Sequence, residues 1–172
     1  MGIILIFLIP VIFFVKRKQN SINNTAGNKL LTVITKTLQS SKVPKINAED
    51  AAQHQGSYIF LDAREKEEYD VSHVQHSIYI GDQDFNIHKL SQISKKANII
   101  VYCAVGVRSD KIAQQIIDAG YSHVQNMFGG IFEWINTGHA VYDNTGNSTK
   151  SIHAYSGFWG MFVNSDHKVY NY

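Results

Sequence analysis

A single cysteine opens the part of this sequence best suited to chemistry. Cys103 is the only cysteine in 172 residues, and it directly follows the apolar run at residues 98–102. Gly106 allows the backbone to curl tightly, and Arg108 adds a fixed positive charge. A turn of this kind, leading from a strand into a helix, directs successive N–H groups toward one atom, here the sulfur. Because these groups favour a thiolate over a thiol, the pattern predicts a sulfur nucleophile.

The alternative interpretation of the same residues is structural. A lone cysteine after a buried strand is commonly a small core hydrophobe. Arg108 has its own alternative, a structural ion pair with a carboxylate. Ser109 fits a cap for the following helix better than a chemical role. The combination of Gly106, Arg108 and Ser109 behind one cysteine favours the reactive interpretation.

The segment at residues 103–109 resembles the active-site loop of the rhodanese-like domains, the thiosulfate and persulfide sulfurtransferases. In that family the cysteine is followed by four residues, an arginine and often a serine. Two further blocks in the same order resemble the family's other signatures, and together the three cover roughly residues 44–142. The first comprises Leu61, Asp62, Ala63, Arg64, Glu65, Glu68, Tyr69, His73, Val74, Ser77 and Ile78. The closing one comprises Tyr121, Phe128, Gly129, Gly130, Ile131, Trp134, Gly138, His139, Ala140 and Val141.

The resemblance implies a fold and a reaction. The fold is α/β, an open and mainly parallel sheet of about five strands with helices on both faces. In the reaction, the Cys103 thiolate takes a sulfane sulfur from a donor such as thiosulfate and passes it from a persulfide to a thiol, cyanide or an acceptor protein. The persulfide-binding loop implied by the family comprises Ala104, Val105, Gly106, Val107, Arg108 and Ser109. Asp62, Arg64 and His73 match residues that mostly brace the family's structure.

Other functions are less consistent with the residues. Cysteine phosphatases place five residues between cysteine and arginine, which encloses a tetrahedral phosphate, whereas here there are four. The eight histidines lack metal-ligand spacing, so no metal and no other cofactor is expected. No basic face within the domain suggests nucleic acid. A noncatalytic, membrane-tethered sulfur carrier or partner-binding module remains the alternative from another class.

The elements needed to position Cys103 alternate along the chain. Strands are expected at residues 44–46, 58–61, 99–102 and 123–127, and helices at 48–52, 65–69, 85–93, 109–119 and 131–136. Asn47 suits the N-cap of the first helix, and Gly120 suits the stop of the fourth. This alternation predicts a parallel sheet, which binds ligands at the carboxyl ends of its strands. Cys103 lies at one such end.

The N-terminal region differs in charge from the rest. Residues 1–48 contain seven basic and no acidic residues, which leaves a net charge of about −5 for the remainder. The uncharged run at residues 2–15 spans about 21 Å as a helix, short of the roughly 30 Å of a bilayer core. Lys16, Arg17 and Lys18 follow it, so residues 1–18 are predicted as a membrane anchor with the domain facing the cytoplasm. A cleaved secretory signal is the alternative.

Two further segments flank the predicted domain at residues 44–142. Residues 19–43 are polar and basic and are expected to form a linker, in which Leu30, Leu31, Ile34 and Leu38 recur at helical spacing. Residues 143–172 form a C-terminal extension rich in aromatic residues. Tyr155, Phe158, Trp159 and Phe162 either pack this tail across the domain or rim the pocket. One cysteine excludes an internal disulfide framework, so nothing requires an oxidising compartment.

Overall fold

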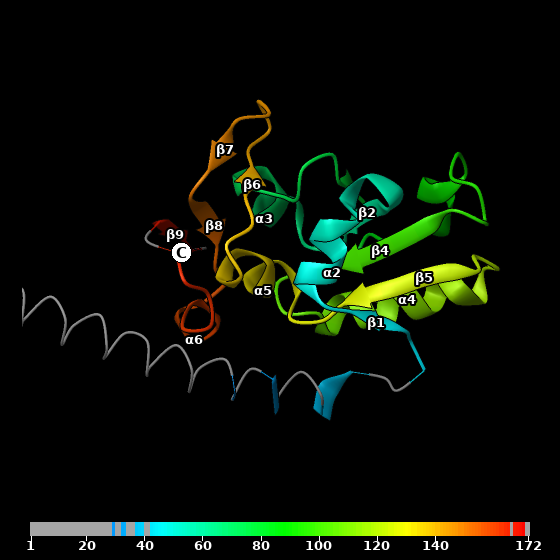
Figure 1. Cartoon of the computed structure of the whole chain (residues 1–172), viewed down its shortest axis with the longest axis horizontal. Helices are drawn as coiled ribbons and strands as arrows, with labels where there is room; N and C mark the ends of the chain where they lie inside the picture. The colour runs from blue at the N-terminus through cyan, green and yellow to red at the C-terminus, as the bar shows by residue number, and fades with distance from the viewer. Residues whose placement is uncertain (1–28, 30–31, 34–36, 40–41, 166, 171–172) are drawn as a thin grey trace, which may run out of the picture.

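The computed structural model describes residues 29, 32–33, 37–39, 42–165 and 167–170 (Figure 1). The predicted anchor at residues 1–18 lies outside the described residues, as does most of the predicted linker, and the anchor stays a prediction. Within the described part of the chain, no helix has the length and apolar character needed to cross a bilayer.

Five parallel strands form the central sheet, in the order β1-β5-β4-β2-β3. Their bounds are β1 Lys45–Ile46, β2 Ile59–Asp62, β3 Ile78–Tyr79, β4 Asn98–Tyr102 and β5 His123–Met127. Two of the inner strands, β4 and β2, are almost wholly apolar, which suits strands covered on both faces. The sheet confirms the predicted α/β fold class.

Helices cover both faces of the sheet (Figure 1). They are α2 Ala48–Gln53, α3 Lys66–Val71, α4 Val107–Asp118, α5 Gly130–Asn136 and α6 Gly157–Gly160. One core cluster joins α2 and α5 to residues such as Phe60 and Ile100 of the sheet. The other joins α4, through Ile112, Ala113 and Ile116, to the opposite face. The sheet is therefore buried between two apolar layers.

Local sequence signals account for several element ends. The side chain of Asn47 accepts a hydrogen bond from Asp50 N–H at 2.7 Å, which confirms it as the N-cap of α2. Gly120, with φ of +92°, follows the last turn of α4 as predicted. The helix expected at residues 85–93 is wrong, because only a 3₁₀ turn forms there, at Ile87–Leu90. Ile87, Leu90 and Ile93 recur every three residues, which is the period of a 3₁₀ helix and not of an α-helix.

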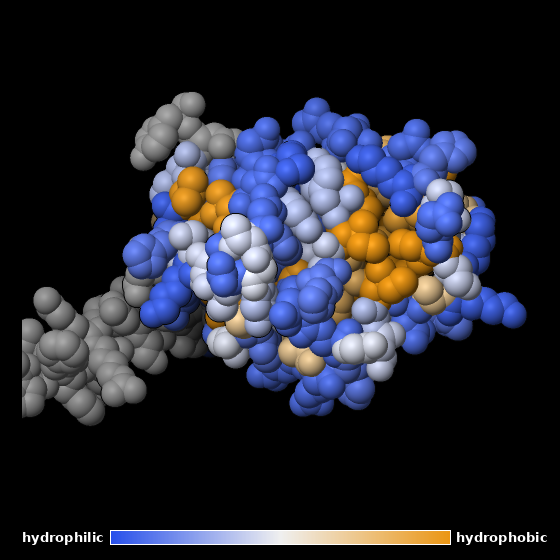
Figure 2. Space-filling view, turned by 90° about the horizontal axis from the view of Figure 1, so that it is seen from above, coloured by the Kyte–Doolittle hydropathy of each residue, from blue (hydrophilic) through white to orange (hydrophobic). Residues whose placement is uncertain are grey.

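The C-terminal extension packs on the domain. Strand β6 Val141–Tyr142 pairs with β7 Ser148–Thr149, and β8 Ser151–His153 pairs with β9 His167–Val169. Ile152, Ala154 and Phe162 are buried in the same cluster as α5. The face in Figure 2 is mostly hydrophilic, with hydrophobic residues gathered in separate areas. Residues 143–165 thus form a layer of the molecule beside the sheet.

A buried ion pair lies at the carboxyl end of β2. The Arg64 guanidinium contacts the Asp62 carboxylate at 2.7 Å, and both side chains are fully buried. Arg64 also donates to the carbonyl of Ser72 at 2.6 Å, which links β2 to the end of α3. Burial disfavours the charged guanidinium, but Asp62 more than compensates, and the pKa of Arg64 is raised. The pair braces the region, as the structural interpretation of these two residues predicts.

Removing one member of this pair should destabilise the fold strongly. We expect Asp62→Ala to lower the free energy of unfolding by about 3–5 kcal/mol, because Arg64 would remain as an uncompensated buried charge. Asp70→Ala is the matched control, since it removes a solvent-exposed partner of Lys66 and should cost less than about 1 kcal/mol. Urea denaturation followed by circular dichroism measures both, and equal losses would contradict the assigned role.

Candidate functional site

Cys103 lies at the end of β4, where the chain turns into α4. Its Sγ accepts a hydrogen bond from the N–H of Gly106 at 3.1 Å. The residue is only 1% exposed, yet it lines a pocket of about 200 Å³ together with Ala104, Val105 and Arg108. The sulfur is therefore at the wall of a cavity beside the first turn of α4, whose N–H groups have no acceptor inside the helix.

Gly106 is held by its carbonyl group. The side-chain amide of Gln39 donates to this oxygen at 2.9 Å, and that of Asn126 donates at 2.8 Å. The residue has φ of +90°, and an added Cβ would lie 2.6 Å from Gln39 Nε2 and 2.9 Å from the carbonyl of Met127. Only glycine suits this position. Because the N–H of a trans peptide points opposite its carbonyl, the Val107 N–H is directed away from both amides.

The N-terminus of α5 holds the other end of the loop. The N–H of Ile131 donates to the carbonyl of Cys103 at 2.9 Å, and the N–H of Phe132 donates to that of Ala104 at 3.1 Å. This contact requires close approach, because a Cβ on Gly130 would lie 2.3 Å from the Cys103 oxygen. The two carbonyls are thus turned toward α5, and the N–H groups of the same peptides point the opposite way.

Arg108 forms a two-pronged ion pair with Glu68 of α3. The nitrogen–oxygen distances are 2.6 and 2.9 Å, and the Glu68 side chain is 1% exposed. Burial raises the pKa of Glu68, but the hydrogen bonds and charge of Arg108 outweigh it, so the net shift is downward. Burial likewise opposes ionisation of Arg108, while Glu68 raises its pKa. The guanidinium lines the pocket with its charge largely balanced.

Glu68 is the principal site residue that sequence reasoning missed. It is part of the first signature block, but no role follows from its position, 40 residues from Arg108. One local signal marks it: Glu65 and Glu68 form a capping box at the start of α3, where Glu68 Oε2 accepts from Glu65 N–H at 3.1 Å. The same carboxylate therefore caps α3 and binds Arg108.

Ser109 does not cap the following helix, and this expectation is wrong. Helix α4 begins at Val107 with Gly106 as its N-cap, so Ser109 is the third helical residue. Its fully buried hydroxyl donates to Asn126 Oδ1 at 2.7 Å, and the amide of Asn126 in turn binds the Gly106 carbonyl. Ser109 thus links the loop to β5. Because Gly106 in its left-handed conformation is the N-cap, the helix begins at Val107, two residues earlier than expected.

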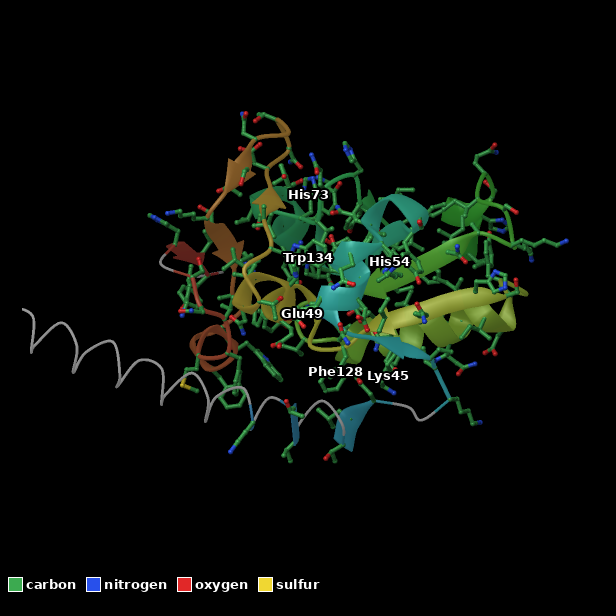
Figure 3. The ribbon with its side chains drawn as sticks, in the orientation of Figure 1. Lys45, Glu49, His54, His73, Phe128 and Trp134 are labelled. Atoms are coloured by element: carbon green, nitrogen blue, oxygen red, sulfur yellow. The ribbon has the colours of Figure 1, made fainter. Side chains whose placement is uncertain are left out.

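His73 has structural contacts, as predicted. Its ring stacks on Tyr69, with centroids 4.0 Å apart and planes 4° apart, and its Nδ1 lies 3.1 Å from the Tyr69 carbonyl. Its backbone bridges to Tyr142. Trp134 of α5 donates from Nε1 to the carbonyl of Ala140 at 2.9 Å. Both residues, labelled in Figure 3, therefore fasten the segment that leads into the C-terminal extension.

Segments outside the signature blocks complete the pocket. Tyr155 and Trp159 of the C-terminal extension line it, as does Leu38. The Tyr155 ring lies over Arg108, with 5.6 Å between the guanidinium carbon and the ring centroid. Trp159 packs edge to face on Phe158 at 5.2 Å between centroids. The C-terminal aromatics therefore do both things considered from the sequence: they pack on the domain and they rim the pocket.

The family model for the rhodanese-like domain matches residues 47–137, a span that contains the whole Cys103 loop and both glycines of the α5 entry. The chain belongs to the rhodanese-like domain family. This span includes four of the five strands of the central sheet. Leu38, Tyr155 and Trp159 lie outside it, so the rhodanese-like domain is joined at its pocket by flanking residues.

Curated relatives of this rhodanese-like chain differ in name and length. Protein HIGH ARSENIC CONTENT 1, mitochondrial, of Arabidopsis thaliana is 27% identical over 135 residues, covering 72% of the chain and 79% of the relative. Thiosulfate sulfurtransferase GlpE of Coxiella burnetii is 26% identical over 80 residues, covering 44% and 70%. The tRNA uridine(34) hydroxylase of Photorhabdus laumondii is 30% identical over 81 residues, covering 44% of the chain but only 23% of the hydroxylase.

Solved structures support the fold. A thiosulfate sulfurtransferase from Pseudomonas aeruginosa is similar with a TM-score of 0.57 and 20% identity, covering 68% of this chain and 23% of that one. The rhodanese-like domain of an Anabaena sp protein is similar with a TM-score of 0.55 and 21% identity, covering 58% and 79%. Both share the fold of this chain.

A methyl group at Gly130 should disturb the loop. Gly130→Ala places a Cβ against the carbonyls of Cys103 and Ala104 at a φ of +57°. The matched control is Gly146→Ala, which has φ of +82° and nothing within 4 Å of the added carbon. Both variants carry backbone strain, but the clash should cost Gly130→Ala about 2 kcal/mol more in unfolding free energy. Denaturant titration of the two variants gives this difference directly, and indistinguishable midpoints would refute the close-approach argument.

Proposed function

We propose that this protein is a sulfurtransferase, an enzyme that moves a sulfane sulfur from a donor such as thiosulfate to a thiol, cyanide or protein acceptor through a persulfide on Cys103. The observation that carries the proposal is the position of Cys103 Sγ, bound by Gly106 N–H at 3.1 Å in the wall of a pocket at the start of α4. Membership of the rhodanese-like family, which includes relatives named as thiosulfate sulfurtransferases, supports it.

The first step forms the persulfide. The Cys103 thiolate attacks the outer sulfur of thiosulfate, a new S–S bond forms, and the S–S bond of the donor breaks. Sulfite leaves with the bonding electron pair. Charge and atoms balance, because one thiolate and one thiosulfate dianion become one persulfide anion and one sulfite dianion. No oxidant or reductant is consumed.

The second step returns the enzyme to its starting state. An acceptor thiolate attacks the terminal sulfur of the Cys103 persulfide and forms the new S–S bond of the product persulfide. The bond to Cys103 breaks, and its electron pair restores the thiolate. With cyanide as acceptor, the corresponding product is thiocyanate.

The residues around the sulfur supply electrostatic stabilisation. The N–H groups of residues 104–109 and the positive end of the α4 dipole favour the anionic thiolate and persulfide. The carbonyls of Cys103 and Ala104 are held by α5, and that of Gly106 is held by Gln39 and Asn126. Since these dipoles are fixed before the donor arrives, no reorganisation is needed during the reaction. Glu68 fixes the orientation of Arg108 beside the site.

The persulfide itself is the direct test. We expect the reduced full-length chain, after incubation with excess thiosulfate, to gain the mass of one sulfur atom by intact mass spectrometry. Cys103→Ser should show no gain, because a hydroxyl cannot form a persulfide and the sequence holds no other cysteine. Subsequent cyanide should remove the added sulfur as thiocyanate in repeated turnovers.

The controls separate this proposal from the two alternatives. Ser122→Ala, which alters an exposed hydroxyl far along the chain from Cys103, should retain the adduct. A persulfide that forms once but never turns over would favour the noncatalytic sulfur carrier. The proposal fails if no adduct forms while the protein hydrolyses an aryl phosphate, since that outcome would indicate a cysteine phosphatase.

A further inference from the structure

The pocket beside Cys103 has walls suited to an organic group. Around the sulfur they are formed by aliphatic side chains, among them Leu38 and Val107, and by the rings of Tyr155 and Trp159. The cavity measures about 200 Å³. An apolar cavity of roughly 150 Å³ is large enough to hold benzene in another protein, so this one has room for an aromatic ring attached to a sulfur donor.

Charge at the same place disfavours a small dianion. Arg108 is the only cation among the described residues that line the pocket, and both oxygens of Glu68 already bind it. The charge of the one cation in the pocket lining is thus largely balanced by Glu68, whose side chain is 1% exposed.

Tyr155 is held over the arginine by an uncommon backbone conformation. Its φ is +62°, in the left-handed region that tyrosine rarely adopts. The ring is half exposed and covers the Arg108 guanidinium at 5.6 Å. A strained conformation persists only where the surroundings enforce it, and here it places an aromatic face at the mouth of the pocket.

From these observations we infer that the site takes an apolar organic sulfane-sulfur donor, a thiosulfonate or hydropersulfide bearing an aryl or aliphatic group, in preference to thiosulfate. The inference rests on the sulfur-transfer function proposed above and assigns its substrate class. With benzenethiosulfonate, the Cys103 thiolate bonds to the outer sulfur, the S–S bond of the donor breaks, and benzenesulfinate leaves with the electron pair. The aromatic ring then lies against Trp159 and Tyr155.

Three sulfur donors separate the effect of the apolar pocket walls on donor preference from the effect of the Arg108 charge. Benzenethiosulfonate and methanethiosulfonate share a reacting group and a single negative charge but differ in the ring, whereas thiosulfate is small and doubly charged. We would measure kcat/KM for each with the full chain and cyanide as acceptor, divided by the rate of the same donor with free cysteine. The wild type should prefer the aryl over the methyl donor by about tenfold, as burial of a ring predicts.

Trp159→Ala should abolish most of that preference by removing one ring from the wall. The matched control is Phe158→Ala, on the same short helix: Phe158 packs on Trp159 and Phe162 but is outside the pocket lining. It should keep the aryl-over-methyl ratio. An equal loss of the ratio in both variants would overturn the inference, because the effect would then come from α6 as a whole.

Glu68→Gln tests the charge. Glutamine can still accept the N–H of Glu65 in the capping box, but it leaves the Arg108 charge unbalanced. The ratio of kcat/KM for thiosulfate to kcat/KM for benzenethiosulfonate should therefore be several-fold higher in this variant than in the wild type. If this variant does not fold by circular dichroism, the Trp159 comparison decides alone. If the wild type has a higher normalised kcat/KM for thiosulfate than for benzenethiosulfonate, the inferred substrate class is overturned, but formation of the persulfide still supports the proposed function. If no donor forms a persulfide, the proposed function itself is overturned.

Discussion

The loop that carries Cys103 is fixed through its carbonyl oxygens. Those of Cys103 and Ala104 bind the N-terminus of α5, and that of Gly106 binds the amides of Gln39 and Asn126. A peptide whose oxygen is held outward must present its N–H on the opposite side. The N–H groups of Ala104, Val105 and Val107, which share these three peptides, are therefore oriented by contacts that do not involve the sulfur. Glycine is needed at Gly106, where the Gln39 side chain and the Met127 carbonyl approach closely, and at Gly130, where the Cys103 carbonyl does.

Two ion pairs support this arrangement in different ways. Asp62 and Arg64 are fully buried at the end of β2 and connect it to the end of α3. Glu68 and Arg108 connect α3 to the first turn of α4, and this pair reaches the pocket. Helix α3 is thus linked at its end to the buried Asp62–Arg64 pair and, through Glu68, to Arg108 of the pocket. Because both oxygens of Glu68 bind the Arg108 guanidinium, this pair fixes the orientation of the guanidinium and also lowers the positive potential in the pocket.

Much of the sheet could be predicted from the sequence because its signals are local. The apolar runs of β2 and β4, the Asn47 cap and the Gly120 stop each depend on a few adjacent residues. Strand β3 escaped prediction because two residues at a sheet edge carry no periodicity. The start of α4 was misplaced at Ser109 because the left-handed Gly106 serves as the cap. Cys103 and Arg108 are close in sequence and were found together.

The missed contacts are those between distant segments. Glu68 lies 40 residues from Arg108, and Gln39 lies 67 residues from Gly106, so no spacing rule connects either pair. The place of Tyr155 and Trp159 in the pocket depends on how β8 and α6 pack against the domain. Such contacts follow from tertiary structure. The sequence indicated which residues could react, and the fold determined what surrounds them.

The pocket is assembled from parts with separate origins in the chain. The sulfur and its amides come from the span shared with the family, whereas Leu38, Tyr155 and Trp159 come from either side of it. Exchange of the C-terminal flank can therefore reshape the pocket without replacing a residue that holds the loop, whereas the N-terminal flank also supplies Gln39, which binds the Gly106 carbonyl. A scaffold divided in this manner can diversify its ligand repertoire through its C-terminal border, while its interior machinery stays under independent constraint.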